Sequence, residues 1–291
     1  MYPNRFDYES PTSVEQAIAI LDRGEGDAKV LSGGQSLIPM LKLRFAAPTT
    51  LVDINNLPDL DYHYVDDEGN LHIGALCRHA DLEESSTLAD THPTLAAAAE
   101  LVADPIVRSR GTFVGSVCHA DPQGDWAATM LAQGGYVVAQ GPNGSRQIDM
   151  GDFVLGPFVT ALAYNEIAVE AVVPGATGTP LGGYLKLERR IGDFATASVA
   201  VSLDMDGEII RKAGCALAGV GGRTIDANEA ISCLVGKALT EDSIDQASDA
   251  IAAVAEPRTD HRGSDAYKRH IVQTFVKRIL TNLAQSEQKA A

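Results

Sequence analysis

Lys29-Val-Leu-Ser-Gly-Gly-Gln-Ser-Leu37 runs from a short buried strand into a glycine pair flanked by hydroxyl side chains. A second stretch of the same kind, Arg110-Gly-Thr-Phe-Val-Gly-Ser116, lies further along the chain. Glycine allows several backbone N–H groups to converge on an anion, and Ser36 and Thr112 can donate further hydrogen bonds. Two such loops that face each other suit the pyrophosphate of a dinucleotide, although each alone is also compatible with an ordinary tight turn.

The residues around the first stretch predict a compact unit of helix and mixed strands. Thr12-Ser-Val-Glu-Gln16 is typical of a capped helix start, and Gly24 ends that helix. Strands are expected at 29–31 and 51–54, and Pro39 suits the first turn of a short helix that ends at Leu43.

Two further units follow. In the second, strands are expected at 71–75, 136–140, 146–149 and 167–173, and helices at 78–84, 94–103 and 125–133. Residues 174–180 form the best linker candidate. In the third, strands are expected at 183–190, 196–205 and 208–220, and helices near 226–234, 240–255 and 264–284. Antiparallel strands followed by helices predict an α+β domain.

Composition and charge exclude several classes of protein. The formal net charge of −16 disfavours nucleic acid and anionic membranes as partners, because both are polyanions. The apolar stretch 167–174 is too short to span a bilayer, and the N-terminus lacks a signal-peptide core, so the cytoplasm is expected. The cysteines form no CxxC pair, so any iron–sulfur chemistry must belong to another chain; they are Cys77, Cys118, Cys215 and Cys233.

Familiar catalytic motifs are missing from the sequence. Gly219-Val-Gly-Gly222 follows a strand but lacks the third glycine of a Rossmann fingerprint, which disfavours a nicotinamide-binding domain. HExxH, GxSxG and GxxxxGK[ST] do not occur. Among the histidines only His119 has a suggestive neighbourhood, next to the second stretch, and nothing pairs it with a nucleophile. This inventory fits a protein whose cofactor supplies the reactivity.

The two glycine stretches, together with His119-Ala-Asp-Pro-Gln-Gly-Asp125, resemble the medium subunit of carbon monoxide dehydrogenase-type molybdoenzymes, the FAD-binding part of the xanthine dehydrogenase superfamily. The first stretch is similar to the family fingerprint A-G-G-x-S and the second to T-x-G-G-[SN]. The likeness covers nearly the whole chain. It also includes Phe6-Asp-Tyr8, Leu185-Lys-Leu-Glu-Arg-Arg190, Gly192-Asp-Phe-Ala-Thr-Ala197 and Tyr267-Lys-Arg269.

This resemblance implies an α+β chain with the vanillyl-alcohol-oxidase/PCMH-type FAD-binding fold. Two α/β subdomains, expected at 1–55 and 56–175, would grip FAD, and 176–291 would form a C-terminal domain of a three-stranded antiparallel sheet with a helix bundle. The implied FAD-binding residues are Lys29, Val30, Leu31, Ser32, Gly33, Gly34, Gln35, Ser36, Leu37, Gly111, Thr112, Val114, Gly115, Ser116, Asp125 and Lys186.

Three of these positions carry alternatives. Asp125 matches an aspartate near FAD in relatives, and it is also a plausible N-cap of the helix that follows. Lys186 falls where relatives place a flavin-contacting lysine, and a surface strand lysine is the other interpretation. Val114 stands where the family has a glycine: a positive φ there would be strained, whereas a negative φ would only shift the loop and leave FAD binding intact. We favour the second case.

The resemblance implies an electron-transfer subunit rather than a complete enzyme. Its partners would be a large subunit with the molybdenum cofactor and a small subunit with two-iron iron–sulfur clusters, as a dimer of heterotrimers. FAD would collect electrons from those clusters and deliver them to an external acceptor. The alternatives are a stand-alone PCMH-type flavin oxidoreductase and a scaffold subunit without FAD. The substrate is not encoded in this chain.

Overall fold

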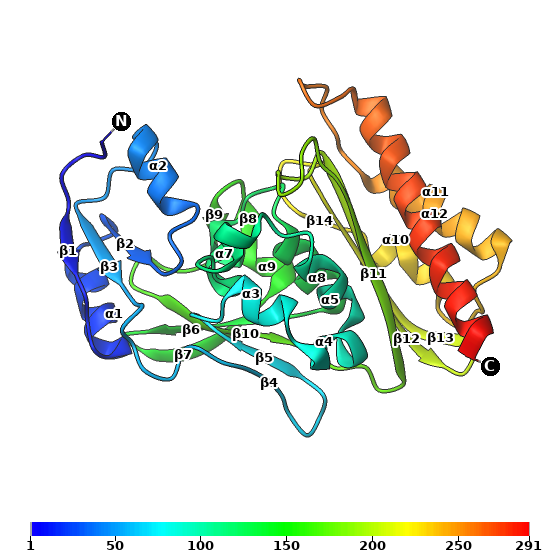
Figure 1. The fold of residues 1–291 in the computed structure, drawn as a ribbon, viewed down its shortest axis with the longest axis horizontal. Coiled ribbons are helices and arrows are strands. Elements are labelled where there is room, and N and C mark those ends of the chain that lie inside the picture. Colours follow the sequence, from blue (N-terminus) through cyan, green and yellow to red (C-terminus); the bar gives the residue numbers. More distant parts are fainter. Residues whose placement is uncertain (1, 291) are drawn as a thin grey trace.

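The computed structural model describes residues 2–290, which fold into an N-terminal lobe, a central lobe and a C-terminal domain (Figure 1). The N-terminal lobe is a parallel sheet with strand order β1-β3-β2 and two helices. Its elements are β1 (Asp7–Glu9), α1 (Val14–Arg23), β2 (Ala28–Leu31), α2 (Leu37–Leu43) and β3 (Thr50–Asp53).

The start of α1 confirms the predicted cap, because the Ser13 side chain accepts a hydrogen bond from the Gln16 amide. The expectation of mixed strands in this lobe is wrong, since all three strands are parallel. The prediction of a short buried strand at 29–31 is wrong in its burial, because Val30 and Leu31 are half-buried and Lys29 is exposed.

The central lobe contains an antiparallel five-stranded sheet in the order β4-β5-β10-β6-β7. Its strands are β4 (His63–Val65), β5 (Leu71–Gly74), β6 (Tyr136–Gly141), β7 (Gly144–Asp149) and β10 (Ile167–Val173). The remaining elements are α3 (His79–Glu83), α4 (Ser86–Thr91), α5 (Pro93–Ala99), α6 (Pro105–Arg108), α7 (Phe113–His119), α8 (Asp125–Gln133), α9 (Met150–Phe153), β8 (Val154–Gly156) and β9 (Val159–Thr160). The expected hairpin at Gly141–Gly144 is confirmed.

The C-terminal domain is an antiparallel sheet followed by helices, which confirms the predicted α+β class. Its elements are β11 (Thr179–Leu187), β12 (Ala197–Asp206), β13 (Ile209–Ala218), β14 (Ile225–Asp226), α10 (Asn228–Ile231), the 3-10 turn η1 (Ser232–Leu234), α11 (Glu241–Val254) and α12 (Asp265–Ala290). The expected three strands are present, and the short β14 adds a fourth at the edge.

Side chains alternate between the two faces of the C-terminal sheet. One face carries mainly larger apolar residues and the other mainly small ones. Val199 and Val201 pack with the helices α10–α12, whereas Ala200 joins the core of the central lobe. On that inner face a Cβ on Gly214 would overlap the Ala132 carbonyl oxygen of α8. Small inner residues therefore let α5 and α8 lie directly on the sheet, which separates them from α11 and α12 (Figure 1).

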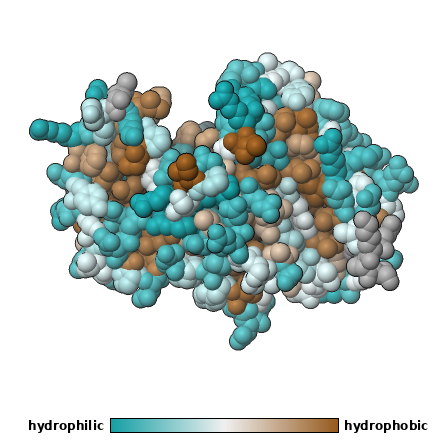
Figure 2. Space-filling model, in the orientation of Figure 1, coloured by the Kyte–Doolittle hydropathy of each residue, from teal (hydrophilic) through white to brown (hydrophobic). Residues whose placement is uncertain are grey.

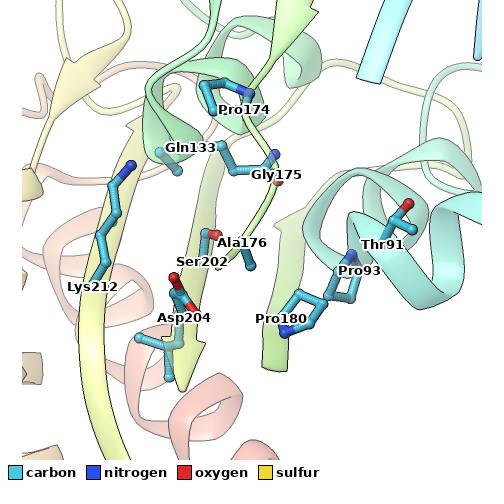
Figure 3. Close-up of a pocket in the computed structure, with 13 residues that line it drawn as sticks. Thr91, Pro93, Gln133, Pro174, Gly175, Ala176, Pro180, Ser202, Asp204 and Lys212 are labelled. Atoms are coloured by element: carbon cyan, nitrogen blue, oxygen red, sulfur yellow. The ribbon is translucent and has the colours of Figure 1, made fainter. Parts of the chain in front are cut away.

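The linker from the central lobe enters β11 beside a small polar cavity of about 40 Å³ (Figure 3). The Asp204 carboxylate accepts hydrogen bonds from the backbone amides of Thr177 and Gly178, at 3.0 and 2.8 Å. Figure 3 shows Lys212 on the neighbouring strand, where it is the cross-strand partner of Asp204. A space of this size admits at most a few water molecules and is too small for a cofactor. It belongs to the junction between the linker and the C-terminal sheet.

Each larger sheet falls in one of the three expected domain ranges, and the boundaries at 55 and 175 stay a prediction. No helix in the described part of the chain combines the length and the apolar character needed to cross a membrane.

Candidate functional site

A cavity of about 540 Å³ separates the N-terminal lobe from the central lobe. Figure 2 shows the molecule hollowed between these lobes along its upper edge. Cofactor pockets have volumes of this order. One wall contains all of residues 29–37, and the other contains Gly111, Thr112, Val114, Gly115 and Ser116. The structure thus brings together the first glycine loop (residues 32–36) and the second glycine loop (residues 111–116).

The first glycine loop lines the cavity with backbone N–H groups that have no protein partner among the described residues. It leaves β2 at Leu31 and turns at Gly34, whose φ of +73° lies in the region that favours glycine. Across the described residues, the amides of positions 33–37 have no protein acceptor. Converging free amides of this kind form an anion-binding concavity.

The second glycine loop is mostly helical, although the sequence suggested a glycine-rich loop. Thr112 caps α7, and its hydroxyl accepts a hydrogen bond from the Gly115 amide at 3.2 Å. Phe113 and Val114 are buried in the core. Val114 has a negative φ, which confirms the unstrained case and removes the objection to valine at this position.

The two glycine loops touch, and glycine makes that approach possible. The Ser32 and Thr112 hydroxyls are 3.0 Å apart. A Cβ on Gly33 would overlap the carbonyl oxygen of Arg110, and one on Gly115 would lie 2.5 Å from the Thr112 hydroxyl. These glycines therefore leave space that any side chain would fill. Free amides and hydroxyls beside that space fit the pyrophosphate of FAD.

A chain of hydrogen bonds, not anticipated from the sequence, ties the two loops together from behind. The Asn55 amide donates to the Ser32 carbonyl at 2.9 Å. The Arg78 guanidinium donates to Asn55 Oδ1 at 2.8 Å and to the Arg110 carbonyl at 2.7 Å. We call Asn55 and Arg78 the loop clasp, because they join one lobe to the other.

Asp125 lines the cavity, but it does not cap α8. Gly124 is the N-cap, so the N-cap interpretation of Asp125 is wrong. Asp125 is the first residue of the helix and accepts a hydrogen bond from the Tyr184 hydroxyl at 2.5 Å. Burial raises the pKa of the Asp125 carboxyl, although Lys186 and the Tyr184 hydroxyl oppose the shift.

Lys186 is not a surface residue, because its side chain is only 1% exposed. Its ammonium lies 3.3 Å from Asp125 and 3.3 Å from Glu188, and it donates to the Leu101 carbonyl. The strand position suggested an exposed side chain, but the packing of β11 against α5 encloses it. Lys186 lies behind Asp125 rather than in the cavity wall, so its contact with FAD stays a prediction.

His119, singled out from the sequence, belongs to the cavity wall. Its ring lies against Phe158, with ring centroids 5.1 Å apart. Burial lowers its pKa, while Asp121 acts in the opposite direction. A neutral imidazole tilted against an aromatic ring fits the wall of a binding site, and the described contacts pair it with no nucleophile.

Comparison with known proteins gives the same picture over the whole chain. Residues 4–176 match the FAD binding domain in molybdopterin dehydrogenase, and residues 183–283 match the CO dehydrogenase flavoprotein C-terminal domain. The chain is 41% identical to the carbon monoxide dehydrogenase medium chain of Hydrogenophaga pseudoflava, over 96% of this chain and 97% of that one. It is 36% identical to the 6-hydroxypseudooxynicotine dehydrogenase complex subunit alpha of Paenarthrobacter nicotinovorans, over 96% and 95% of the two chains.

Solved structures agree with these matches. Carbon monoxide dehydrogenase from Hydrogenophaga pseudoflava gives a TM-score of 0.93 at 40% identity over 99% of both chains. Quinoline 2-oxidoreductase from Pseudomonas putida 86 gives 0.90 at 30% identity, again over 99% of both chains.

The fold and the cavity define an FAD-binding protein of the PCMH type, in which two α/β lobes enclose the cofactor site and an α+β domain follows. The matches then define the family. This chain belongs to the FAD-binding medium subunits of the carbon monoxide dehydrogenase-type molybdenum hydroxylases, within the xanthine dehydrogenase superfamily. The resemblance noted in the sequence is confirmed, as are FAD as cofactor and the status of an oxidoreductase subunit.

Proposed function

We propose that this chain is the electron-transfer subunit of a heterotrimeric molybdenum hydroxylase or dehydrogenase. It would stand between the two-iron iron–sulfur clusters of a small subunit and an external acceptor, while a large subunit with the molybdenum cofactor carries out the substrate chemistry. We also propose a dimer of heterotrimers located in the cytoplasm. Full-length similarity to medium chains supports this assignment.

The observation that carries the proposal is the single cavity lined by both glycine loops. We assign the backbone amides of the first glycine loop, with Ser32 and Ser36, to the FAD pyrophosphate. Thr112, Gly115 and Ser116 form the opposing wall, and Lys29, Val30, Leu31 and Leu37 flank the first loop. FAD supplies the redox chemistry, because flavin exchanges electrons singly or in pairs.

The chain's own contribution is binding and orientation. The loop clasp fixes the separation of the loops, and the buried pair of Asp125 and Lys186 fixes the position of a carboxylate in the cavity wall. We assign Asp125 a cofactor contact, with Lys186 in support behind it. None of these residues has to act as an acid or base in substrate turnover.

The test is co-expression of this chain with the neighbouring genes, followed by purification of the complex. We expect two further chains, molybdenum, iron, and one FAD per copy of this chain. Removal of FAD should leave substrate-dependent bleaching of the iron–sulfur clusters intact while reduction of an external dye is lost. Dye reduction that survives FAD removal would contradict the proposed electron path.

Denaturation of the purified protein separates the proposal from its alternatives. Free FAD in the supernatant supports it. Flavin that stays attached to the polypeptide would favour a stand-alone PCMH-type oxidoreductase. Absence of flavin from an intact complex would favour a scaffold subunit.

A further inference from the structure

We propose that His79 is a further cofactor-binding residue, which donates a hydrogen bond from its ring Nε2–H to the dinucleotide bound in the cavity. This inference rests on the proposed function and deepens it. It concerns a side chain outside both glycine loops, at the start of α3, and it assigns that side chain a fixed protonation state.

The imidazole of His79 lies directly against the second glycine loop. The His79 amide donates to the Gly111 carbonyl at 3.0 Å. A Cβ on Gly111 would lie 2.8 Å from both Cδ2 and Nε2 of the ring. The ring is also part of the cavity wall. Gly111 thus leaves the space that the imidazole occupies beside the proposed pyrophosphate site.

Trp126 fixes the tautomer of this ring. The indole Nε1–H of Trp126 lies 3.0 Å from His79 Nδ1. An indole N–H can only donate, so Nδ1 must carry a lone pair and the neutral ring holds its proton on Nε2. Burial, with the nearby Arg108 and Arg78, lowers the pKa of His79 to about 4, which keeps the ring neutral near pH 7.

The remaining donor has no protein partner. His79 is only 5% exposed as a residue, and no hydrogen bond joins Nε2 to another of the described residues. Nε2 itself is not fully enclosed, and His79 lines the cavity, so a ligand acceptor in the cavity can complete this donor. Because Nε2 is protonated, His79 is unsuited to bind a metal ion or to act as a general base through that atom.

The experiment measures FAD affinity of the full-length chain for wild type, His79→Leu and His79→Gln. Leucine keeps an apolar volume and removes the donor, and we expect affinity to fall about tenfold or more. Glutamine retains an N–H donor, and we expect most of the affinity to return. His92→Leu is the matched control, because His92 is 1% exposed and bonds to the Val173 carbonyl outside the cavity.

The control should lower thermal stability without changing FAD affinity. Equal FAD affinity in wild type and His79→Leu would overturn this inference alone. Failure of the folded wild-type chain to bind FAD would instead overturn the proposed function. If His79→Leu fails to fold, the comparison of wild type with His79→Gln and Trp126→Phe decides. Loss of the tautomer lock in Trp126→Phe should weaken binding while His79→Gln keeps most of the affinity, and unchanged affinity in Trp126→Phe would count against the assignment.

Discussion

In the first glycine loop Gly34 has a φ of +73°, whereas residues 111–116 of the second glycine loop all have negative φ. The first loop is a turn that lines the cavity, and its amides have no protein acceptor among the described residues. The second is the first turn of α7, capped by its own Thr112. The two loops line one cavity, but they use glycine for different reasons.

This difference shows which glycines can be replaced. In the first loop glycine has two roles. At Gly34 it allows the positive φ, and at Gly33 it allows the backbone of Arg110 and Gly111 to approach closely. In the second loop glycine only provides space, at Gly111 for His79 and at Gly115 for Thr112. Val114 stands between those contacts and packs into the core, so a side chain is accepted there.

Gly33→Ala should have the largest effect on the contact between the two loops. The added Cβ would meet backbone atoms of Arg110 and Gly111, which cannot rotate away. We expect a loss of about 3 kcal/mol, at the upper end of the range for overpacking. FAD affinity should fall about 100-fold. The measurement is an FAD titration of the full-length chain, with circular dichroism to verify folding.

Gly151→Ala is the control for that substitution. Gly151 is exposed in α9, its φ is not positive, and no atom lies within 4 Å of an added Cβ. We expect unchanged FAD binding. Wild-type affinity in Gly33→Ala would show that the loops do not need this close approach.

Acid should destabilise the packing of His79 against the second glycine loop, and the first loop has no such histidine contact. His79 has a folded pKa of about 4, below its ordinary value of 6.5. Between these two pKa values the folded ring stays neutral while the unfolded ring gains a proton. The contribution of His79 to the free energy of unfolding is therefore complete above pH 6.5. This contribution is lost as the pH falls towards 4, by about 3 kcal/mol in all.

The check is urea unfolding of the FAD-free chain between pH 7.5 and pH 4.5, for wild type and His79→Gln. The carboxylates are common to both proteins, so the difference between their pH profiles isolates the histidine. We expect the wild type to lose more stability than the variant on acidification. Parallel profiles would mean that His79 is not buried in the neutral form.

The main elements could be predicted because they depend on local signals. Alternating apolar residues, the Ser13 cap and the turn at 141–144 all act over a few positions. α7 was missed because Gly111 and Gly115 break the local helical pattern. The helix forms nonetheless, because Thr112 caps it and Phe113 and Val117 are buried.

The site residues also divide into those that local sequence predicts and those that depend on tertiary contacts. Both glycine loops were predictable, because their residue types are needed within one short stretch. Asn55 and Arg78 were not, because their partnership arises only when β3 and α3 are brought together. The enclosure of Lys186 likewise depends on a neighbouring helix, although its strand alone suggested exposure.

The loop clasp offers a smaller test of how the two loops are coupled. Arg78→Ala removes the donors to Asn55 Oδ1 and to the Arg110 carbonyl. Since Arg78 is half-buried and water can replace part of this contact, we expect a cost of about 1 kcal/mol, or about fivefold in FAD affinity.

Arg78→Lys should lie between wild type and alanine, because lysine cannot reproduce the forked geometry. Arg23→Ala is the control, since its ion pair with Glu9 is largely exposed and neither residue lines the cavity. An affinity loss of equal size in Arg23→Ala would point to long-range charge rather than to the clasp.

Val114→Ala should have the smallest effect on the cofactor. The change removes two buried methyl groups but introduces a better helix former, so stability should fall by about 1 kcal/mol. FAD affinity should stay within about twofold of wild type, because position 114 makes no contact that joins the loops. Urea unfolding and FAD titration measure the two quantities separately. A large change in affinity with little change in stability would mean that the second loop, like the first, depends on glycine-like backbone freedom.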